Sequence, residues 1–404
     1  MNKKSTLFVL ITLAVAVAAV YISHSRAPET EVGTPQLFPA LAGQVNDVVQ
    51  VEVKSRLNNV DLMKDGDGWV IASRDKYPAS FEQVKGAILD LSDMKIIEAK
   101  TSKPELYSRL DVQDVDADKS RSTQVTLKDK TGKVLASLII GKAREGHPSP
   151  LGALRYVRRA SEAQSYLVAG DLNVKADPLS WTSREIADIS GSRIRSVRLE
   201  QPGQPPVEID RDKPSDVNFN LKDIPDGYKP KSTAILTSLS TVLEQLRFDD
   251  VRAKAALKWP DDSDVATLRG FDGLVATIRT STIDGRQYST LAFSFDAAGV
   301  EKPAPDDKTK AAGQGDDKDK KDEKKPVPEE VKALNAKLGN WAYVLPDFKL
   351  KMLTATRDSL LTKKQAPKPP VAEPPPPKDP MKVEHFDKNG HLIPNPPAPA
   401  APAH

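Results

Sequence analysis

The sequence predicts an α+β fold: two repeated modules of mostly antiparallel sheet with one main helix each, behind an N-terminal transmembrane helix. Three observations lead to this prediction. An apolar run follows two lysines near the start of the chain, strand patterns surround one amphipathic helix, and the same order of patterns recurs in the second half. Hairpin-like turns between most strands favour antiparallel pairing, with the helix packed on one face of the sheet.

The composition suits folded domains with less ordered additions. A chain of 404 residues is long enough for two domains of ordinary size. The 33 prolines, against 21 glycines, indicate that part of the chain is not packed core. The net charge of +3 from 59 basic and 56 acidic residues gives no reason to expect a nucleic-acid partner. The absence of cysteine excludes disulfides, Cys-ligated metals and a thiol nucleophile.

Residues 1–26 are predicted to be an N-terminal transmembrane anchor or a signal. The apolar run from Leu7 to Ile22 has 16 residues, whereas a membrane span needs about 20, with a lower limit near 17, and a signal-peptide core has about 7–15. Lys3 and Lys4 would keep the start of the chain in the cytoplasm. We expect a single-pass protein of the cell inner membrane, in contact with the bilayer through residues 5–23, with the bulk of the chain in the periplasm.

The alternative is a cleaved signal, for which Ala16 and Ala18 offer an Ala-x-Ala site. Cleavage there would leave several apolar residues on the mature end, which favours the uncleaved anchor. Residues 27–44 contain three prolines and are predicted to be a spacer between the membrane and the first module.

The first module, module 1, is predicted at residues 45–190. Its main helix follows Pro78, and Ser80 and Gln83 have capping-box spacing. The helix has an apolar face formed by Phe81, Val84, Ile88 and Leu91. Alternating or apolar patterns predict these strands: 48–53, 60–63, 69–71, 122–128, 134–140, 154–158 and 166–169.

The second module, module 2, is predicted at residues 191–362. Pro230 and Ser232 stand 152 positions after Pro78 and Ser80. The expected apolar face of its helix, Ile235, Leu239 and Val242, has an offset of 151. We assign 274–280 and 288–295 as the counterparts of the strands 122–128 and 134–140. The other predicted strands are 194–199, 206–209, 218–221 and 341–345.

Two segments are predicted to be disordered. Residues 300–330 form an insertion of mixed charge without aromatic residues, which is typical of a solvated loop. Residues 363–404 are rich in proline and poor in core residues, so we expect a disordered or polyproline-like tail.

Three short motifs carry a family resemblance. They are Leu106–Asp111 (LYSRLD), Val134–Gly141 (VLASLIIG) and Asp177–Ile189 (DPLSWTSREIADI). With them, the chain resembles the family catalogued as domain of unknown function 4340 from about residue 47 to residue 363. The resemblance implies single-pass proteins whose domain lies outside the cytoplasmic membrane. It also implies an association with ABC transporter components like those of gliding-motility systems, and thus integral membrane transporter subunits as partners.

We find no catalytic, cofactor-binding or metal-binding motif. The five histidines lack paired ligand spacing, and His147 with Ser149 reads as a loop. Asp114, Asp116 and Asp118 alternate like the start of a calcium loop, but the glycine and glutamate that such a loop requires are missing. Two arginine groups could bind anionic lipid headgroups, although a solvated strand face is the simpler interpretation: Arg155, Arg158 and Arg159, and Arg193, Arg195 and Arg198.

We therefore expect a membrane-anchored, periplasmic, non-catalytic binding or scaffold protein, accessory to an ABC-type membrane complex and without a cofactor. One alternative is an envelope hydrolase that uses two carboxylates, because no spacing rule exposes such a pair. Another is a periplasmic ligand-binding module with its site between the two repeats. The junction of the modules should distinguish them: facing carboxylates favour the enzyme, a dry apolar cleft the ligand-binding module, and a well-packed junction the scaffold.

Overall fold

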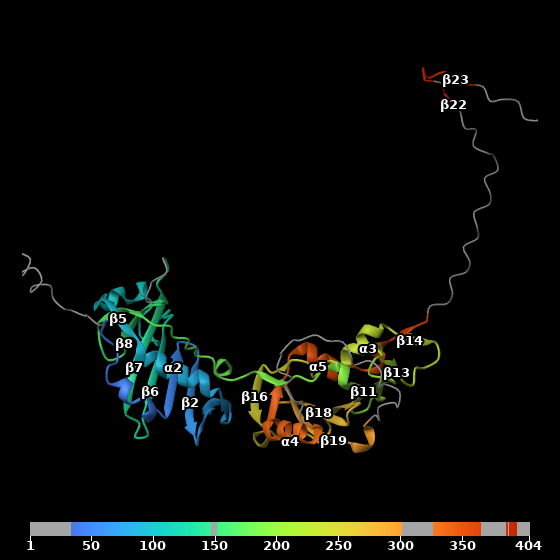
Figure 1. Ribbon diagram of the computed structural model, residues 1–404, viewed down its shortest axis with the longest axis horizontal. Coiled ribbons are helices and arrows are strands. Elements are labelled where there is room, and N and C mark those ends of the chain that lie inside the picture. The colour runs from blue at the N-terminus through green and yellow to red at the C-terminus, as the bar shows by residue number, and fades with distance from the viewer. Residues whose placement is uncertain (1–33, 147–151, 301–325, 365–384, 387, 394–404) are drawn as a thin grey trace, which may run out of the picture.

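The computed structural model describes residues 34–146, 152–300, 326–364, 385–386 and 388–393. The predicted anchor at 1–26, the loop with His147 and Ser149, and most of the insertion and of the proline-rich tail lie outside these residues. Within the described part of the chain, every helix is too short or too polar to cross a membrane. Figure 1 shows two bodies that correspond to module 1 and module 2, joined next to β16.

Module 1 contains a nine-stranded sheet in which every pair of neighbours is antiparallel, in the order β4-β3-β2-β1-β6-β7-β8-β9-β5. Its strands are β1 (Gln50–Ser55), β2 (Asn59–Asp65), β3 (Gly68–Ile71), β4 (Tyr77–Ala79), β5 (Lys95–Ala99), β6 (Thr123–Lys128), β7 (Val134–Ala143), β8 (Leu154–Arg159) and β9 (Ser165–Ala169). The seven predicted strands of module 1 are thus accompanied by β4 and β5, which the sequence patterns missed because they are short and partly polar.

The main helix α2 (Phe81–Asp93) begins where the capping box predicts. The Ser80 hydroxyl accepts a hydrogen bond from the Gln83 N–H at 3.4 Å. The helix buries Val84, Ile88 and Leu91 as expected, but Phe81 is 46% exposed. As the first residue of the helix, Phe81 lies at the surface, where the Lys85 ammonium is 5.9 Å from its ring centroid.

Module 2 contains an eight-stranded antiparallel sheet in the order β13-β12-β11-β17-β18-β19-β20-β16. Its strands are β11 (Ile194–Glu200), β12 (Val207–Asp210), β13 (Asn220–Leu221), β16 (Asp250–Ala253), β17 (Asp264–Gly270), β18 (Leu274–Ile283), β19 (Arg286–Phe295) and β20 (Trp341–Val344). Short β14 (Tyr228–Pro230) pairs separately with β21 (Leu361–Lys363). The predicted α+β class with mostly antiparallel sheets is therefore confirmed.

Apart from β4 at the edge of the first sheet, the two sheets have the same strand order. If β11, β12 and β13 are matched to β1, β2 and β3, then β17, β18, β19, β20 and β16 take the places of β6, β7, β8, β9 and β5. The sequence analysis matched 274–280 and 288–295 to β6 and β7, but as β18 and β19 they correspond to β7 and β8. The assignment was wrong by one strand because it missed β17. The few apolar residues of β17 give a weak pattern, and pairing with β11 and β18 decides its structure.

The helix of module 2 is also displaced by one residue from the prediction. Of the predicted apolar face, Leu239 and Val242 are buried but Ile235 is 42% exposed, and α3 (Thr233–Ser240) with the turn after it also buries Leu236 and Leu243. Leu236, Leu239 and Leu243 stand 152 positions after Val84, Ala87 and Leu91, the same offset as that of the proline and serine before each helix. The helix start, not the apolar pattern alone, thus gives the correct register.

Module 2 has more than the one expected helix. In addition to α3 it contains α4 (Val327–Leu338), α5 (Asp347–Leu353) and α6 (Arg357–Leu360). The predicted insertion at 300–330 therefore ends within α4. The helix is stabilised by the interaction of its dipole with Glu329 and Glu330 in the first turn and with Lys337 in the last turn. The charged composition that suggested a loop therefore also stabilises the helix.

The predicted spacer and tail also contain ordered structure. Leu37 and Leu41 are buried in the core of module 1, and Gln36 forms a bridge with Lys95 at the edge of β5. Module 1 therefore begins before residue 45. At the other end, Lys363 belongs to β21, and β22 (His385–Phe386) pairs with β23 (Leu392–Ile393) within the predicted tail.

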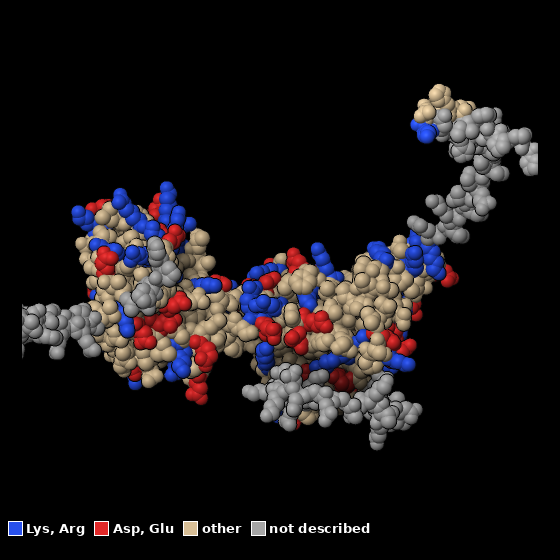
Figure 2. All heavy atoms as spheres, turned by 45° about the horizontal axis from the view of Figure 1, so that its top comes forward, with Lys and Arg blue, Asp and Glu red and all other residues tan. Residues whose placement is uncertain are grey.

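Charges of both signs are interspersed over most of the face seen in Figure 2. This distribution agrees with the small net charge of +3. The polar faces are held by ion pairs such as those of Glu208 with Arg198 and Lys222, both at 3.0 Å. Exposed pairs of this kind contribute little to stability, about 0–1 kcal/mol each.

Candidate functional site: the junction between the modules

The segment that connects the modules is packed along its length. Trp181 lies in the hydrophobic core of module 1, whereas Leu179, only two residues earlier, lies in that of module 2. Asp177 orders this turn, because its side chain accepts a hydrogen bond from the Leu179 N–H at 3.2 Å. The chain thus enters the second core before it has left the first.

The connection then joins the sheet structure of module 2. Strand β10 (Glu185–Ala187) pairs with β15 (Leu246–Arg247). Arg184 and Phe248 exchange hydrogen bonds, with the Phe248 N–H donating to the Arg184 carbonyl at 3.1 Å and Arg184 Nε to the Phe248 carbonyl at 3.0 Å. Ile186 and Ile189 are buried in the same core. The core of module 2 therefore includes residues before the predicted boundary at 190, and no slack chain separates the modules.

Tyr77 is a residue of module 1 whose side chain is buried in the core of module 2. It belongs to the last short strand before α2, yet its ring packs among the aromatic residues of module 2 and is 7% exposed. The ring centroids lie 4.8 Å from Trp341, 5.5 Å from Phe248 and 6.4 Å from Tyr343, all in edge-to-face arrangements. Such aromatic pairs add about 0.5–1.5 kcal/mol to the burial term.

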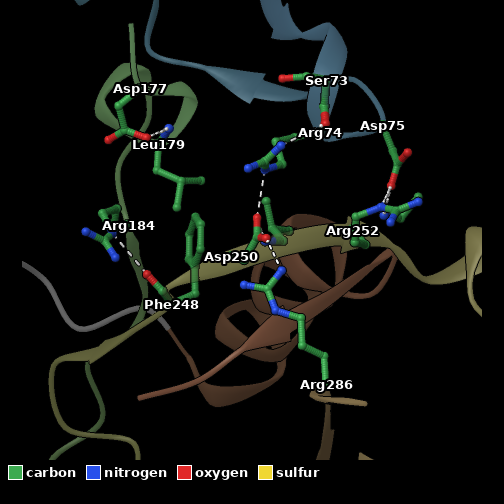
Figure 3. A network of polar contacts seen from close by, with 12 residues as sticks. Ser73, Arg74, Asp75, Asp177, Leu179, Arg184, Phe248, Asp250, Arg252 and Arg286 are labelled. Atoms are coloured by element: carbon green, nitrogen blue, oxygen red, sulfur yellow. Dashed lines mark hydrogen bonds and ion pairs between the residues drawn. The ribbon is translucent and has the colours of Figure 1, made fainter. Parts of the chain in front are cut away.

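Figure 3 shows ion pairs that join the two modules near Phe248. Asp250, whose side chain is 10% exposed, lies between Arg74 of module 1 and Arg286 of module 2, with N–O distances of 2.7 Å to each. Asp75 of module 1 accepts hydrogen bonds from Arg252 Nε at 2.6 Å and from the Ala253 N–H at 2.9 Å. Each module thus supplies a carboxylate to an arginine of the other.

A strained turn presents the module 1 residues. Asp75 and Lys76 both have a left-handed backbone conformation, with φ of 52° and 64°, which is uncommon for residues other than glycine. Strain of this kind costs about 1–3 kcal/mol per residue and persists where surrounding contacts enforce it. Here the contacts across the junction and the hydrogen bond from the Lys76 N–H to the Ile71 carbonyl hold the turn.

The charges of the junction shift the pKa of Asp75. Burial raises this pKa, but the hydrogen bonds from Arg252 and the Ala253 N–H, with the charges of Arg252 and Arg74, outweigh burial and hold it below its ordinary value of 3.8. The hydrogen bonds that Arg252 donates to Asp75 and Arg286 donates to Asp250 raise the pKa of these two arginines. Both arginines remain charged at any pH at which the fold exists.

Asp75 should therefore make the junction sensitive to acid. Its pKa is lower in the folded than in the unfolded state, so its stabilising contribution is present above the unfolded value and is lost as pH falls through the lowered folded value. We expect the free energy of unfolding of the wild type to fall between about pH 5 and pH 2 more steeply than that of Asp75→Asn. The free energy of unfolding is measured by urea titration of both proteins at a series of pH values. If it falls equally with pH in the wild type and in Asp75→Asn, Asp75 is not the source of the acid sensitivity.

The Tyr343 hydroxyl gives a second prediction at the junction. Tyr343 is fully buried, and its hydroxyl lies near that of Tyr77 but makes no hydrogen bond of good geometry among the described residues. Because an unpaired buried hydroxyl costs about 1–3 kcal/mol, Tyr343→Phe should raise the thermal unfolding midpoint or leave it unchanged. Tyr107→Phe is the control, since the Tyr107 hydroxyl donates to the Ala163 carbonyl and its loss should lower the midpoint. An equal decrease in both variants would refute the prediction.

The structure places the predicted arginine groups within modules rather than on one binding surface. Arg158 is buried, stacks on Tyr107 at 4.7 Å and donates to the Val112 carbonyl, to the Glu162 carbonyl and to Asp114. The sequence analysis favoured a solvated strand face for this arginine, and the burial of Arg158 shows that this interpretation was wrong. The other arginines also have partners. They are the Gly141 carbonyl for Arg155, Glu162 for Arg159, Glu330 and Asp272 for Arg193, the Phe271 ring at 6.0 Å for Arg195, and Glu200 and Glu208 for Arg198.

The acidic residues that resembled a calcium loop have separate partners. Asp114 pairs with Arg158, and Asp116 pairs with Lys54 at 2.8 Å. Across the described parts of the chain, no group of three or more His, Asp or Glu side chains is arranged to hold a metal ion. The junction residues Arg74, Tyr77 and Asp250 were absent from the sequence analysis, and only the position of Tyr77 directly before the helix-initiating Pro78 could have drawn attention to them.

Comparison with known proteins identifies one family. Residues 69–269 match the model of the family described as Domain of unknown function (DUF4340). No curated protein and no solved structure matches the chain. The matched region runs from β3 to β17 and so contains the strained turn, Tyr77, the connecting segment and Asp250. Over these residues the chain resembles the family described as Domain of unknown function (DUF4340), in agreement with its sequence motifs.

Proposed function

We propose that this protein is a non-catalytic scaffold of the periplasm, anchored in the cell inner membrane by residues 5–23. Its two modules act as one arm that braces or binds integral subunits of an ABC-type transporter. The observation that carries the proposal is the packed junction. A chain that crosses between cores within two residues, an inserted tyrosine and reciprocal ion pairs together oppose bending between the modules.

Rigidity is useful to a scaffold for a physical reason. A partner that must contact both modules pays a smaller entropic cost when the two are already held in one relative orientation. Domain interfaces within a chain otherwise permit relative motion by default. The carboxylates at this junction, Asp75 and Asp250, are each held by arginines, so acid–base chemistry there would require an ion pair to break. This arrangement favours the scaffold over the carboxylate hydrolase.

The proposal is tested by crosslinking and affinity purification of the full chain from solubilised membranes at native expression level. We expect integral membrane proteins to co-purify with the wild type. Tyr77→Ala, which uncouples the modules, should recover less of the same proteins at equal amounts of bait. Ser73→Ala, a substitution in the same turn, is the matched control. If no membrane protein co-purified with the wild type, the scaffold proposal would be wrong.

The location is tested separately from the partner. In intact cells with a permeabilised outer membrane, added protease should digest both modules while residues at the N-terminus remain protected. N-terminal sequencing of the mature protein should begin near Met1. A start near Ala19 or Ala27 would mean that the tether is removed, and the anchored scaffold would then be excluded even if the chain is exported.

A further inference from the structure

A trough of about 650 Å³ runs along one side of α4 in module 2. Its volume lies within the range of about 300–1,000 Å³ that small-molecule sites have. The residues that matter for its chemistry are Arg193, Val327, Glu330, Ala333, Leu334 and Lys337. Most of them come from α4, so the site is built on a regular element of the fold.

The spacing of the α4 residues gives the trough an apolar middle. Val327, Glu330, Leu334 and Lys337 follow one another at intervals of three or four residues and therefore lie on one side of the helix. Val327 and Leu334 are half-buried against the core, and Ala333 leaves space beside them. The twelve residues of α4 span about 18 Å, which gives the trough an elongated shape.

The end of the trough at the start of α4 has no free positive charge. Arg193 donates to both oxygens of Glu330, each at 2.9 Å, and its Nε donates to Asp272 at 2.9 Å. These hydrogen bonds to Glu330 and Asp272 outweigh burial and raise the pKa of Arg193. With two carboxylates around one guanidinium, this end repels an anion.

The opposite end offers a cation. Lys337 Nζ donates to the carbonyl oxygens of Glu185 and Ile186, both at 3.2 Å. An ammonium group has three donors, so one remains, and none of the ion pairs found in the described part of the chain involves Lys337. The two carbonyls hold the ammonium at the end of the trough without neutralising it.

We infer that this trough binds a single-chain anionic amphiphile, namely a medium-chain fatty acid with its carboxylate at Lys337 and its alkyl chain along Val327, Ala333 and Leu334. The uneven charge of the two ends fixes the orientation, and the apolar middle of elongated shape matches an alkyl chain better than a polar ligand. This site lies within module 2 and does not depend on the proposed scaffold function.

The absence of cysteine allows a local test in the full chain. A single cysteine introduced by Ala333→Cys is labelled with an environment-sensitive fluorophore and titrated with decanoate or with decan-1-ol. The matched control is Ala336→Cys, because Ala336 is exposed on α4 like Ala333 but does not line the trough. Lys337→Gln and the control Lys332→Gln are then added to the Ala333→Cys background, because Lys332 is exposed on the far side of the same helix.

We expect a saturable decanoate response at position 333 and none at position 336. Lys337→Gln should raise the half-saturating concentration of decanoate about tenfold, the usual effect of losing a hydrogen bond to a charged group, and should leave that of decan-1-ol unchanged. Lys332→Gln should alter neither. The inference would be overturned if labelled Ala333→Cys gave no saturable response to decanoate, or if positions 333 and 336 responded equally. It would also be overturned if Lys337→Gln changed the half-saturating concentrations of decanoate and decan-1-ol by the same factor.

Discussion

Tyr77→Ala is expected to uncouple the two modules and to lower the free energy of unfolding of module 2 by about 3 kcal/mol, the usual cost of truncating a buried aromatic residue. Tyr77 lies in the chain of module 1 but is 7% exposed within the core of module 2. Its removal leaves a cavity between Phe248 and Trp341 and also removes three edge-to-face contacts. Only the connecting segment and the polar contacts of Asp75 and Asp250 would then hold the modules together.

Two measurements distinguish uncoupling from a general loss of stability. Urea unfolding followed by tryptophan fluorescence and circular dichroism should separate into two transitions in Tyr77→Ala, because the modules no longer unfold together. Distances between spin labels, one on each module, should broaden at the same time. Tyr107→Ala is the matched control, since Tyr107 is equally buried but lies in a small cluster within module 1. If both variants broaden the distances equally, Tyr77 has no special role at the junction.

Asp250→Ala should have the second largest effect, a loss of about 2–3 kcal/mol. This residue is the shared partner of Arg74 and Arg286, and its side chain also accepts a hydrogen bond from the Val251 N–H at 2.9 Å. Removing one partner of a buried ion pair leaves the other charge uncompensated, which costs about 3–5 kcal/mol when burial is complete. Arg286 is 55% exposed and regains water, so we expect a smaller value.

The contribution across the junction can be isolated by a double-mutant cycle of Asp250→Ala and Arg74→Met. We expect a coupling energy of about 1 kcal/mol or more between these residues. Asp249→Ala is the neighbouring control, because Asp249 is 54% exposed in its pair with Arg184, and surface pairs contribute about 0–1 kcal/mol. A coupling energy near zero would show that Arg74 and Asp250 are adjacent without mutual stabilisation.

Measuring both module coupling and co-purification of membrane proteins in Tyr77→Ala tests whether the scaffold requires a rigid junction. If the scaffold proposal is right, Tyr77→Ala reduces co-purification of membrane proteins although each module still folds. If co-purification persists with uncoupled modules, a single module carries the binding surface, and rigidity of the arm is not required. Neither Tyr77 nor Asp250 lines the fatty-acid trough on α4, so its binding curve provides an internal measure of the integrity of module 2.

Local signals in the sequence determined where helices start and which strands form hairpins. Ser80 and Ser232 cap their helices through hydrogen bonds to N–H groups two or three residues later, as their spacing predicts. The repeated order of patterns predicted two similar modules, and the two sheets have matching strand orders. These features depend on interactions between residues close in sequence or on periodicity along one strand, and both can be recognised in a linear chain.

Only the tertiary structure decided the features that join the halves of the protein. Tyr77 and Phe248 are 171 positions apart in the sequence, and nothing local in either segment predicts that their rings meet. Strand β17 depends on its two neighbours, and α4 on contacts of Val331, Leu334 and Leu338 with the core. The sequence by itself therefore determined what each module is built from. The docking of the modules, and with it the candidate site, depends on long-range packing and charge pairing that no pattern along the chain records.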